Sequence, residues 1–524
     1  MSKQNVFRTI RPFLYGCITG IICGAVIALF LVCSKVVISF AFDVYSLERA
    51  PLAVICTLIL VLLCCLLVAV LQTLIPQSKG SGIPLAEGCA RGMLKVKWLR
   101  TAAALIAGSL LAFLSGMPLG SEGPSIGVGG LIGEGVGQAT KKPIHFRRYL
   151  ITGGASAGLA AAFNAPLTGI AFALEETHRR FSPSILLAAF SAVIPAVIVS
   201  QLMFWGFGQI EYLASLGVKQ GAAVLPFLEQ KSYAAITDML IVCGIAAVAG
   251  ALCAAIACAF NCCIFALGKL FAKIKSASLR LIPAFMLTAV CGLIIARSVG
   301  TGEATFAHVS IDTALGTLIL LLALRFLLTA AASGSGATGG LFLPMIAIGG
   351  LLGTVIAKVA VKCGLDSAYA PNIIMLCVSA FFAASARAPI SAIAMAVELT
   401  MSFANLLPCA VAVGLATAIA GLLKSAPLYE RMMENLYRDA VKDGEDITVA
   451  GTIPACSFIC GKRIRDVLWP HNSLVVELNR AGVEIVPDGE TVLLEGDKLT
   501  IRAENVNSAE FTVQMQDYIT HNRN

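Results

Sequence analysis

Charged residues are scarce in this chain: they make up only 13% of its 524 residues, whereas 58% are hydrophobic. Ordinary soluble domains carry about 25% charged residues. A metal-binding spacing is also lacking, because the 18 cysteines lie mostly in apolar runs and Cys456 and Cys460 have only His471 nearby as a third ligand. We therefore expect a membrane protein that is not an enzyme and that has no metal, no cofactor and no nucleic-acid partner.

Long apolar runs take the place of the missing charge. A helix needs about 20 residues to cross a bilayer, and most of the runs are long enough. They are Phe13–Phe42, Leu52–Leu74, Ala102–Leu119, Leu150–Leu174, Ile185–Phe207, Ile236–Leu267, Ala314–Ala332 (interrupted by Arg325) and Ile373–Val397. The 48 glycines indicate interrupted, closely packed helices. The predicted fold class is an all-α polytopic membrane protein.

The distribution of charge predicts how the chain sits in the membrane. Lys3, Arg8 and Arg11 precede the first apolar run, which is too long for a signal peptide and is followed by no small-residue cleavage site. We expect a retained first helix that starts in the cytoplasm. Residues 441–524 carry a net charge of −5, so the first 440 carry +13. This basic part fits an anion-handling surface or the positive-inside rule equally well.

One stretch, Gly120-Ser121-Glu122-Gly123-Pro124, combines features that a membrane interior normally excludes. Its glycines break regular helix, and its proline suits the first turn of a new one. Glu122 is an ionisable group at bilayer depth, which is costly and typical of a cavity or pathway. A helix from Pro124 to Gly137 would begin inside the membrane with free N–H groups that attract an anion. Glu122 can be that anion, or it can give way to another.

The second half of the chain repeats the first. The shared positions fall into two sets, displaced by 220 and by 223 residues, and internal repeats with paired broken helices are typical of secondary transporters. The first set matches Pro124 and Gly129–Gly133 with Pro344 and Gly349–Gly353; the second matches Ser156-Ala157 with Ser379-Ala380, Ala165-Pro166 with Ala388-Pro389, and Glu175 with Glu398. The pattern does not distinguish parallel from inverted halves.

The repeat also separates acidic residues that have an acidic counterpart in the other half from those that do not. Glu175 has a counterpart in Glu398, which favours a shared structural role such as hydrogen bonding to a helix end. Glu122 and Glu176 have no acidic counterpart, so we single them out as functional candidates. The alternative for Glu176 is a solvated helix end.

Two further patterns have competing interpretations. Gly334, Gly336 and Gly339 form G-x-G-x-x-G, which a membrane oxidoreductase could use, but the stretch lies between apolar runs rather than in a soluble strand–helix unit. We reject a dinucleotide site there. Tyr429 follows the last apolar run and, on its position alone, is an interfacial anchor.

The composition changes from about Val441 onward. Charged residues rise to a quarter of the segment, and short alternating runs separated by turn residues predict strands. The predicted strands are Leu474–Leu478, Val483–Val486, Thr491–Leu494 and Lys498–Arg502. We expect a small soluble α/β domain over 441–524.

Four motifs together resemble the signatures of the CLC chloride channel and transporter family, in the family's order and over about residues 10–435. They are Gly80-Ser81-Gly82-Ile83-Pro84, Gly120-Ser121-Glu122-Gly123-Pro124, Gly340-Leu341-Phe342-Leu343-Pro344 and Pro427-Leu428-Tyr429. Ser121 departs from the pattern, because the family commonly has Arg there. The tail resembles the C-terminal regulatory (TrkA-C) domain of potassium-transport regulators.

The resemblance implies an inverted repeat over 1–440, with halves at about 10–207 and 234–435, and a homodimer with one anion pathway per subunit. It implies that chloride is bound by the hydroxyls of Ser81 and Tyr429 and by the backbone N–H groups of Leu341 and Phe342. Glu122 would be the outer gate, and Glu176 the inner proton-transfer residue of the family's antiporters.

The function that follows is exchange of chloride for protons, and the alternative is a passive, voltage- or proton-gated chloride channel of the same fold. The expected partners are chloride, protons, the lipid bilayer and a small regulatory ligand at the tail. The expected location is a prokaryotic inner or plasma membrane, with both termini in the cytoplasm.

Overall fold

The first half of the chain forms a sequence of helices that proline and glycine divide. The computed structural model describes residues 3–46, 50–179, 181–211, 233, 236–302, 309–440, 444–454, 457 and 459–520. The helices are α1 (Lys3–Ser46), α2 (Pro51–Leu74), η1 (Pro76–Ser78), α3 (Gly82–Ala90), α4 (Trp98–Leu114), α5 (Glu122–Ala139), α6 (Ile144–Phe163), α7 (Pro166–Phe172), η2 (Ala173–Thr177) and α8 (Pro183–Gly208). A polar linker runs in the sequence from about Gly208 to Tyr233, and most of it lies outside the described residues.

The second half contains the counterparts of these helices. They are α10 (Ile236–Ala272), α11 (Ala277–Ile294), η4 (Ala296–Ser298), α13 (Leu315–Ser335), α14 (Phe342–Lys362), η5 (Ser367–Tyr369), α15 (Ala370–Ala386), α16 (Pro389–Thr400), α17 (Leu406–Leu422) and α18 (Leu428–Ala440). Among the described residues, eight helices are long and apolar enough to cross a membrane. The fold class predicted from the sequence is therefore confirmed.

Some apolar runs are not single spans. The run Leu150–Leu174 divides into α6 and α7 and the run Ile373–Val397 into α15 and α16, because a proline starts each second helix where it leaves no N–H unpaired. The residue that ends α6, Asn164, and the one that ends α15, Arg387, both adopt the left-handed conformation, with φ of 53° and 64°. The repeat therefore extends from the sequence to the backbone.

Each half of the chain supplies a carboxylate that binds the start of a helix in the other half. Glu398 of the second half accepts hydrogen bonds from the N–H groups of Leu167 (2.6 Å) and Thr168 (2.8 Å) at the start of α7. In the mirror arrangement, Glu175 of the first half accepts from Ile390 (2.8 Å) and Ser391 (2.6 Å) at the start of α16. The hydroxyl of Thr168 or Ser391 adds a third bond to each. The structural role predicted for this pair is confirmed.

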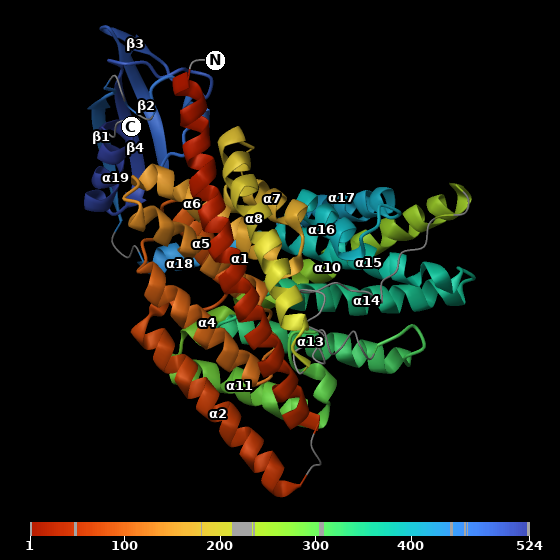
Figure 1. Ribbon diagram of the computed structural model, residues 1–524. Coiled ribbons are helices and arrows are strands. Elements are labelled where there is room, and N and C mark those ends of the chain that lie inside the picture. Colours follow the sequence, from red (N-terminus) through yellow and green to blue (C-terminus); the bar gives the residue numbers. More distant parts are fainter. Residues whose placement is uncertain are drawn as a thin grey trace.

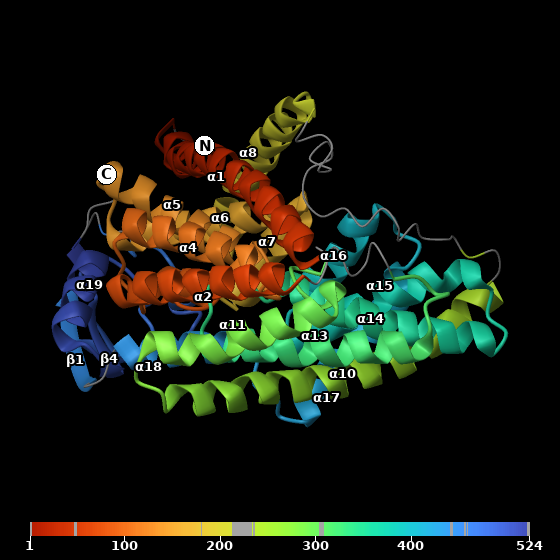
Figure 2. The ribbon, with the colours of Figure 1, turned by 90° about the horizontal axis from the view of Figure 1, so that it is seen from below.

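The halves lie against each other as two layers. Figure 2 shows α2 and α4 of the first half along one side of α11 and α13 of the second half. Gly120 and Gly340 pair in antiparallel fashion where the two halves meet. The largest buried cluster contains residues of both halves, including Phe113, Phe163, Phe260 and Phe342.

The tail forms a four-stranded antiparallel sheet with a helix packed on it. Its elements are β1 (Glu445–Thr452), η6 (Ile464–Asp466), β2 (Ser473–Arg480), β3 (Val483–Ile485), β4 (Lys498–Val506) and α19 (Ser508–Thr520), with strand order β1-β4-β2-β3. It has its own apolar core, in which Leu478, Leu499 and Tyr518 are fully buried. Figure 1 shows this domain at one end of the helical body, beside the start of α1.

One predicted strand of the tail is wrong. Thr491–Leu494 does not join the sheet, because its backbone bonds pair with the loop before β2: the Gly461 N–H donates to Leu493 and the Leu493 N–H donates to Lys462. Strand β1 and helix α19 were not predicted from the sequence. The other predicted strands correspond to β2, β3 and β4.

Candidate functional site

Two helices of opposite halves begin at one point near the centre of the molecule. The Gly120 N–H donates to the Gly340 carbonyl at 2.8 Å, and the Gly340 N–H donates back at 2.7 Å. Helix α5 starts two residues later at Glu122, earlier than the Pro124 start predicted from the sequence, and α14 starts at Phe342. The first turn of each helix has N–H groups without intrahelical partners and a partial positive charge. Together they form an anion-attracting centre.

Glycine is required where the predicted motifs meet. A Cβ atom on Gly82 would lie 2.4 Å from the Gly123 carbonyl oxygen, and one on Gly123 would lie 2.5 Å from the Gly340 Cα and 2.6 Å from the Ser81 Oγ. Gly80 has a φ of 77°, which favours glycine. The structure therefore brings the Ser81, Glu122 and Phe342 motifs together by backbone contact.

Ser81 precedes helix α3, and its side chain is only 5% exposed. Its Oγ accepts a hydrogen bond from the Ile83 N–H at 3.4 Å, so its own proton is left to donate to an anion. Ser81 also lines a cavity of about 520 Å³. The charged residues around this cavity are Lys79, Lys269, Arg431, Glu434 and Arg438. The excess of basic groups makes the cavity an approach for anions.

Glu122 is 3% exposed and lies at the first position of α5. Its Oε1 accepts a hydrogen bond from the Ser121 hydroxyl at 3.2 Å. A Cβ on Gly120 would come within 2.3 Å of the Glu122 Oε2, so the carboxylate folds back over that glycine. Ser121, which stands where the family commonly has Arg, thus gives the Glu122 carboxylate a neutral hydrogen-bond donor.

Glu176 lies in a π-helical turn, η2, that continues α7. The counterpart α16 is α-helical throughout, so the repeat is broken in geometry where it is broken in sequence. Such turns are frequent at functional sites. Glu176 is 1% exposed, and its carboxylate oxygens have no hydrogen-bond partner in the described part of the chain. The alternative of a solvated helix end is therefore wrong.

Tyr429 lies at the start of α18 and is fully buried, which excludes an interfacial anchor. Its hydroxyl has no hydrogen-bond partner among the described residues. The carboxyl groups whose charge acts on this hydroxyl are those of Glu176, Glu87 and Glu122. Tyr429 therefore lies among both predicted functional glutamates, with an O–H group available to donate.

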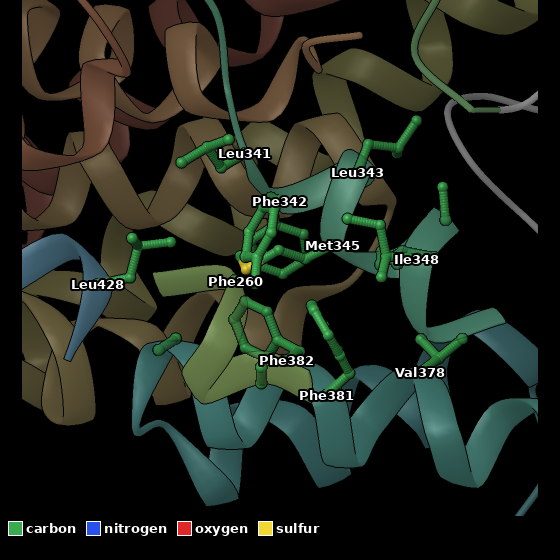
Figure 3. Close-up of a cluster of buried hydrophobic side chains, with 14 of the residues drawn as sticks. Phe260, Leu341, Phe342, Leu343, Met345, Ile348, Val378, Phe381, Phe382 and Leu428 are labelled. Atoms are coloured by element: carbon green, nitrogen blue, oxygen red, sulfur yellow. The ribbon is translucent and has the colours of Figure 1, made fainter. Parts of the chain in front are cut away.

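Aromatic packing fixes the start of α14. The Phe342 ring lies 4.9 Å from the Phe163 ring and 4.4 Å from the Phe382 ring, measured between centroids. Figure 3 shows Phe342 and Phe382 in this cluster, with Leu341 at one side and Leu428 approaching from α18. Side-chain burial leaves the backbone N–H groups of Leu341 and Phe342 as the polar part that these residues offer to the site.

One buried carboxyl group was missed by sequence reasoning. Glu87, on α3, is 1% exposed, and its two carboxylate oxygens have no hydrogen-bond partner in the described part of the chain. The signal was available, because Glu87 is the one charged residue between Lys79 and Arg91. Its burial follows from the packing of α3 against α5, α6 and α18, which no local pattern encodes.

The tail domain contacts the same short helix. Arg148, on α6, is 4% exposed, and it donates to the carbonyl of Ala90 at the end of α3 (2.7 Å) and to the carbonyl of Leu468 in the tail (2.5 Å). It also donates to the Tyr518 hydroxyl. Gln514 of α19 donates to the Gly92 carbonyl at 3.2 Å. One buried guanidinium thus joins α3, α6 and the tail.

His471 lies at this junction, with its ring 5.7 Å from that of Tyr437. Burial holds the pKa of His471 below its usual value, and the positive charges of Arg91 and Arg148 lower this pKa further. The neutral imidazole is therefore the form that fits the junction.

The fold and the paired helix starts define a polytopic membrane protein of the inverted-repeat transport class. The family described as "Voltage gated chloride channel" matches residues 64–421, and the "TrkA-C domain" family matches residues 452–515. The chain belongs to the voltage-gated chloride channel family, the CLC family predicted from the sequence, and it carries a TrkA-C domain.

Curated relatives and a solved structure agree with this assignment. The chain is 31% identical over 403 residues to the "H(+)/Cl(-) exchange transporter ClcA" of Yersinia pestis bv. Antiqua (strain Angola), covering 74% of this chain and 79% of the relative. It is 29% identical over 383 residues to the protein of the same name from Vibrio cholerae serotype O1 (strain M66-2), covering 71% and 77%. A slow cyanobacterial Cl−/H+ antiporter structure matches with 27% identity and a TM-score of 0.72, covering 82% and 98%.

Proposed function

We propose that this protein is an antiporter that moves chloride across the membrane in exchange for protons. The observation that carries the proposal is the burial of Glu176. Together with Glu122 it gives the membrane part a second buried carboxyl group, which a passive channel does not need. The names of the exchangers to which the chain is similar support the same assignment. Chloride and proton fluxes should be recorded together from liposomes that contain the full-length protein. A chloride gradient should drive protons uphill; chloride flux without proton movement would favour the passive channel.

The proposed chloride site consists of hydroxyl and backbone donors. The Ser81 hydroxyl, the Tyr429 hydroxyl and the N–H groups of Leu341 and Phe342 replace the water that the ion loses. Partial charges suit this task, because a full positive charge would hold the ion too tightly for turnover. Glu122 competes for the same centre when it is ionised and leaves it when it is protonated. Glu176 takes up the proton on the inner side.

Ser81→Ala is expected to weaken chloride binding about tenfold, because a hydrogen bond to a charged group contributes roughly 1.5–3 kcal/mol. Calorimetric titration of chloride into the detergent-solubilised protein measures this change. Ser115→Ala is a matched control, since its buried hydroxyl bonds only to carbonyls of its own helix, at 2.9 Å. Equal affinities of the Ser81 variant and the unmodified protein would remove Ser81 from the site.

We also propose that the tail is a cytoplasmic regulatory domain that acts on helix α3 and takes a small regulatory ligand. The domain holds the end of α3 through Arg148 and Gln514, and Ser81 lies at the beginning of the same nine-residue helix. A ligand that moved the tail would therefore move the helix that positions a chloride donor. The match to the TrkA-C domain supports this role.

Arg148→Ala is expected to loosen the tail from the membrane part while the tail stays folded on its own core. Hydrogen exchange in α19 should increase, and transport should remain measurable with altered regulation. Arg147→Ala is the matched control, because Arg147 pairs with Glu134 of α5 at 2.7 Å and not with the tail. Unchanged exchange in the Arg148 variant would show that the contact does not hold the domain.

We propose that the protein works as a homodimer in a prokaryotic inner or plasma membrane, with both termini in the cytoplasm. Pro12 of α1 and Lys462 of the tail line one cavity of about 260 Å³, which supports placing both ends on one side of the membrane. Ile198, Leu202 and Trp205 of α8 are more than half exposed and need lipid or a second copy to cover them. The mass of the detergent-solubilised particle tests the dimer.

A further inference from the structure

Glu87 is the one acidic residue of α3, and it differs in its burial from Glu434 of the neighbouring helix α18. Its carboxyl group is 1% exposed, whereas Glu434 on α18 is exposed to the basic cavity. A buried carboxylate without a hydrogen-bond partner is costly, and such groups persist where they serve a function. Neither the chloride donors nor the proposed proton pair explains its presence.

The face of α3 that carries Glu87 is turned toward Glu176. Arg91 follows Glu87 by four residues, which places the two on the same face of the chain as it leaves the helix. Arg91 donates to the backbone carbonyls of Glu176 (2.9 Å) and Thr177 (2.8 Å). Arg91 is the residue that contacts the turn containing Glu176. Glu87 therefore lies one helical turn before that contact, on the side of α3 toward Ser81.

The charged groups around Glu87 belong to several elements that pack against α3. Burial is the main factor that opposes ionisation of Glu87, and the negative charges of Glu176 and Glu430 add to it. The positive charges of Arg91 and Arg179 favour ionisation. Arg179 is itself paired with Glu430, the residue after Tyr429, at 2.5 Å. The groups contributed by the elements packed on α3 are Glu176 and Arg179 at the π-helical turn, Tyr429 and Glu430 of α18, and Arg148 of α6. Two buried carboxyl groups so placed do not ionise together readily, so the pair retains a proton.

Tyr429 is within reach of the charges of all three glutamates. Its buried hydroxyl, which has no hydrogen-bond partner among the described residues, is acted on by the charges of Glu176, Glu87 and Glu122. By helix rise, Glu87 lies about 9 Å along α3 from Ser81. A proton on Glu176 thus has a second buried carboxyl group as an acceptor, on the helix that begins at Ser81.

We propose that Glu87 is a second proton-carrying residue of the exchange reaction, between Glu176 and Glu122. The Glu176 carboxylic acid gives its proton to the Glu87 carboxylate, directly or through water, so that the charge moves from one residue to the other. The proton then leaves Glu87 toward Glu122, and Glu176 is reprotonated from the cytoplasm. This inference rests on the proposed antiport function.

Glu87→Gln tests the proposal in liposomes in which proton and chloride fluxes are recorded together. The amide keeps the shape of the side chain and cannot carry the proton, so we expect proton flux to fall by about tenfold or more. Chloride flux should persist, and the ratio of protons to chloride should therefore drop. Glu87→Asp, which keeps an ionisable group, should restore part of the ratio. Glu134→Gln, in a peripheral ion pair with Arg147, is the control and should keep the ratio of the unmodified protein.

The outcomes separate this inference from the antiport proposal. If the unmodified protein moves no protons uphill, the antiport proposal fails, whatever Glu87 does. If it does and Glu87→Gln keeps its ratio, or if both fluxes fall together, Glu87 is not a proton carrier. Should Glu87→Gln fail to fold, the pH profile of exchange by Glu87→Asp decides: a shifted profile supports the role, and a profile identical to that of the unmodified protein overturns it.

Discussion

Glu122→Gln is expected to let chloride through without proton coupling and to remove most of the pH dependence of the flux. Ionised, the Glu122 carboxylate occupies the centre formed by the helix starts, because N–H donors and the partial positive charge favour the charged form there. The amide imitates the protonated side chain at every pH. On this expectation one residue would both compete with the anion and carry the proton, which is a direct physical route to exchange.

The measurement is the chloride efflux and the proton uptake of liposomes across a range of pH. Glu122→Ala should behave in the same way and also leave room for an additional anion beside Gly120. Ser121→Ala is the matched control, because it removes the hydroxyl that donates to the carboxylate but keeps the carboxylate itself. If Glu122→Gln still drove protons uphill on a chloride gradient, Glu122 would not be the gate.

Glu176→Gln is expected to abolish proton movement and keep chloride movement. Glu176 is buried in a turn held by Arg91 and supplies none of the proposed chloride donors. Its loss should therefore interrupt the proton route and leave the anion route intact. Because Glu122 can still be protonated from the outer side, the chloride flux of this variant should keep a pH dependence that Glu122→Gln lacks.

The neighbouring carboxylate supplies the control for this variant. Glu175→Gln removes an acceptor from the start of α16, so it should lower the thermal stability of the protein while the ratio of protons to chloride stays the same. Intact proton pumping by Glu176→Gln would return Glu176 to a structural role. A loss of coupling in both variants would point to distortion of the turn and not to the chemistry of Glu176.

The sequence predicts features that local chemistry or repetition encodes. Glycine and proline indicate a helix start at Pro124, two residues after α5 begins at Glu122, and the repeat separates the structural Glu175 from Glu176. Glu87 lies outside the matched parts of the repeat, and although it is the one charged residue between Lys79 and Arg91, only packing in three dimensions reveals its burial. Likewise, Arg148 looks like any basic residue near a helix start until the tail covers it.

The tail shows the same limit on a smaller scale. Its three predicted strands that join the sheet alternate clearly between buried and exposed residues or lie beside a tight turn. Thr491–Leu494 has similar composition, but its backbone partners are in a loop some 30 residues earlier, at residues 461–462. Pairing over that distance is decided by tertiary contacts and not by the residues of the segment itself.

Glu175 and Glu398, which link the two halves, affect how the protein can move. Many secondary transporters open to one side and then the other by tilting one repeat against its twin. Here such a tilt would break six charge-assisted bonds to Glu175 and Glu398, at a cost on the order of 10 kcal/mol. These bonds therefore oppose a tilt of one half against the other, whereas rotation of a single side chain such as Glu122 would break none of them.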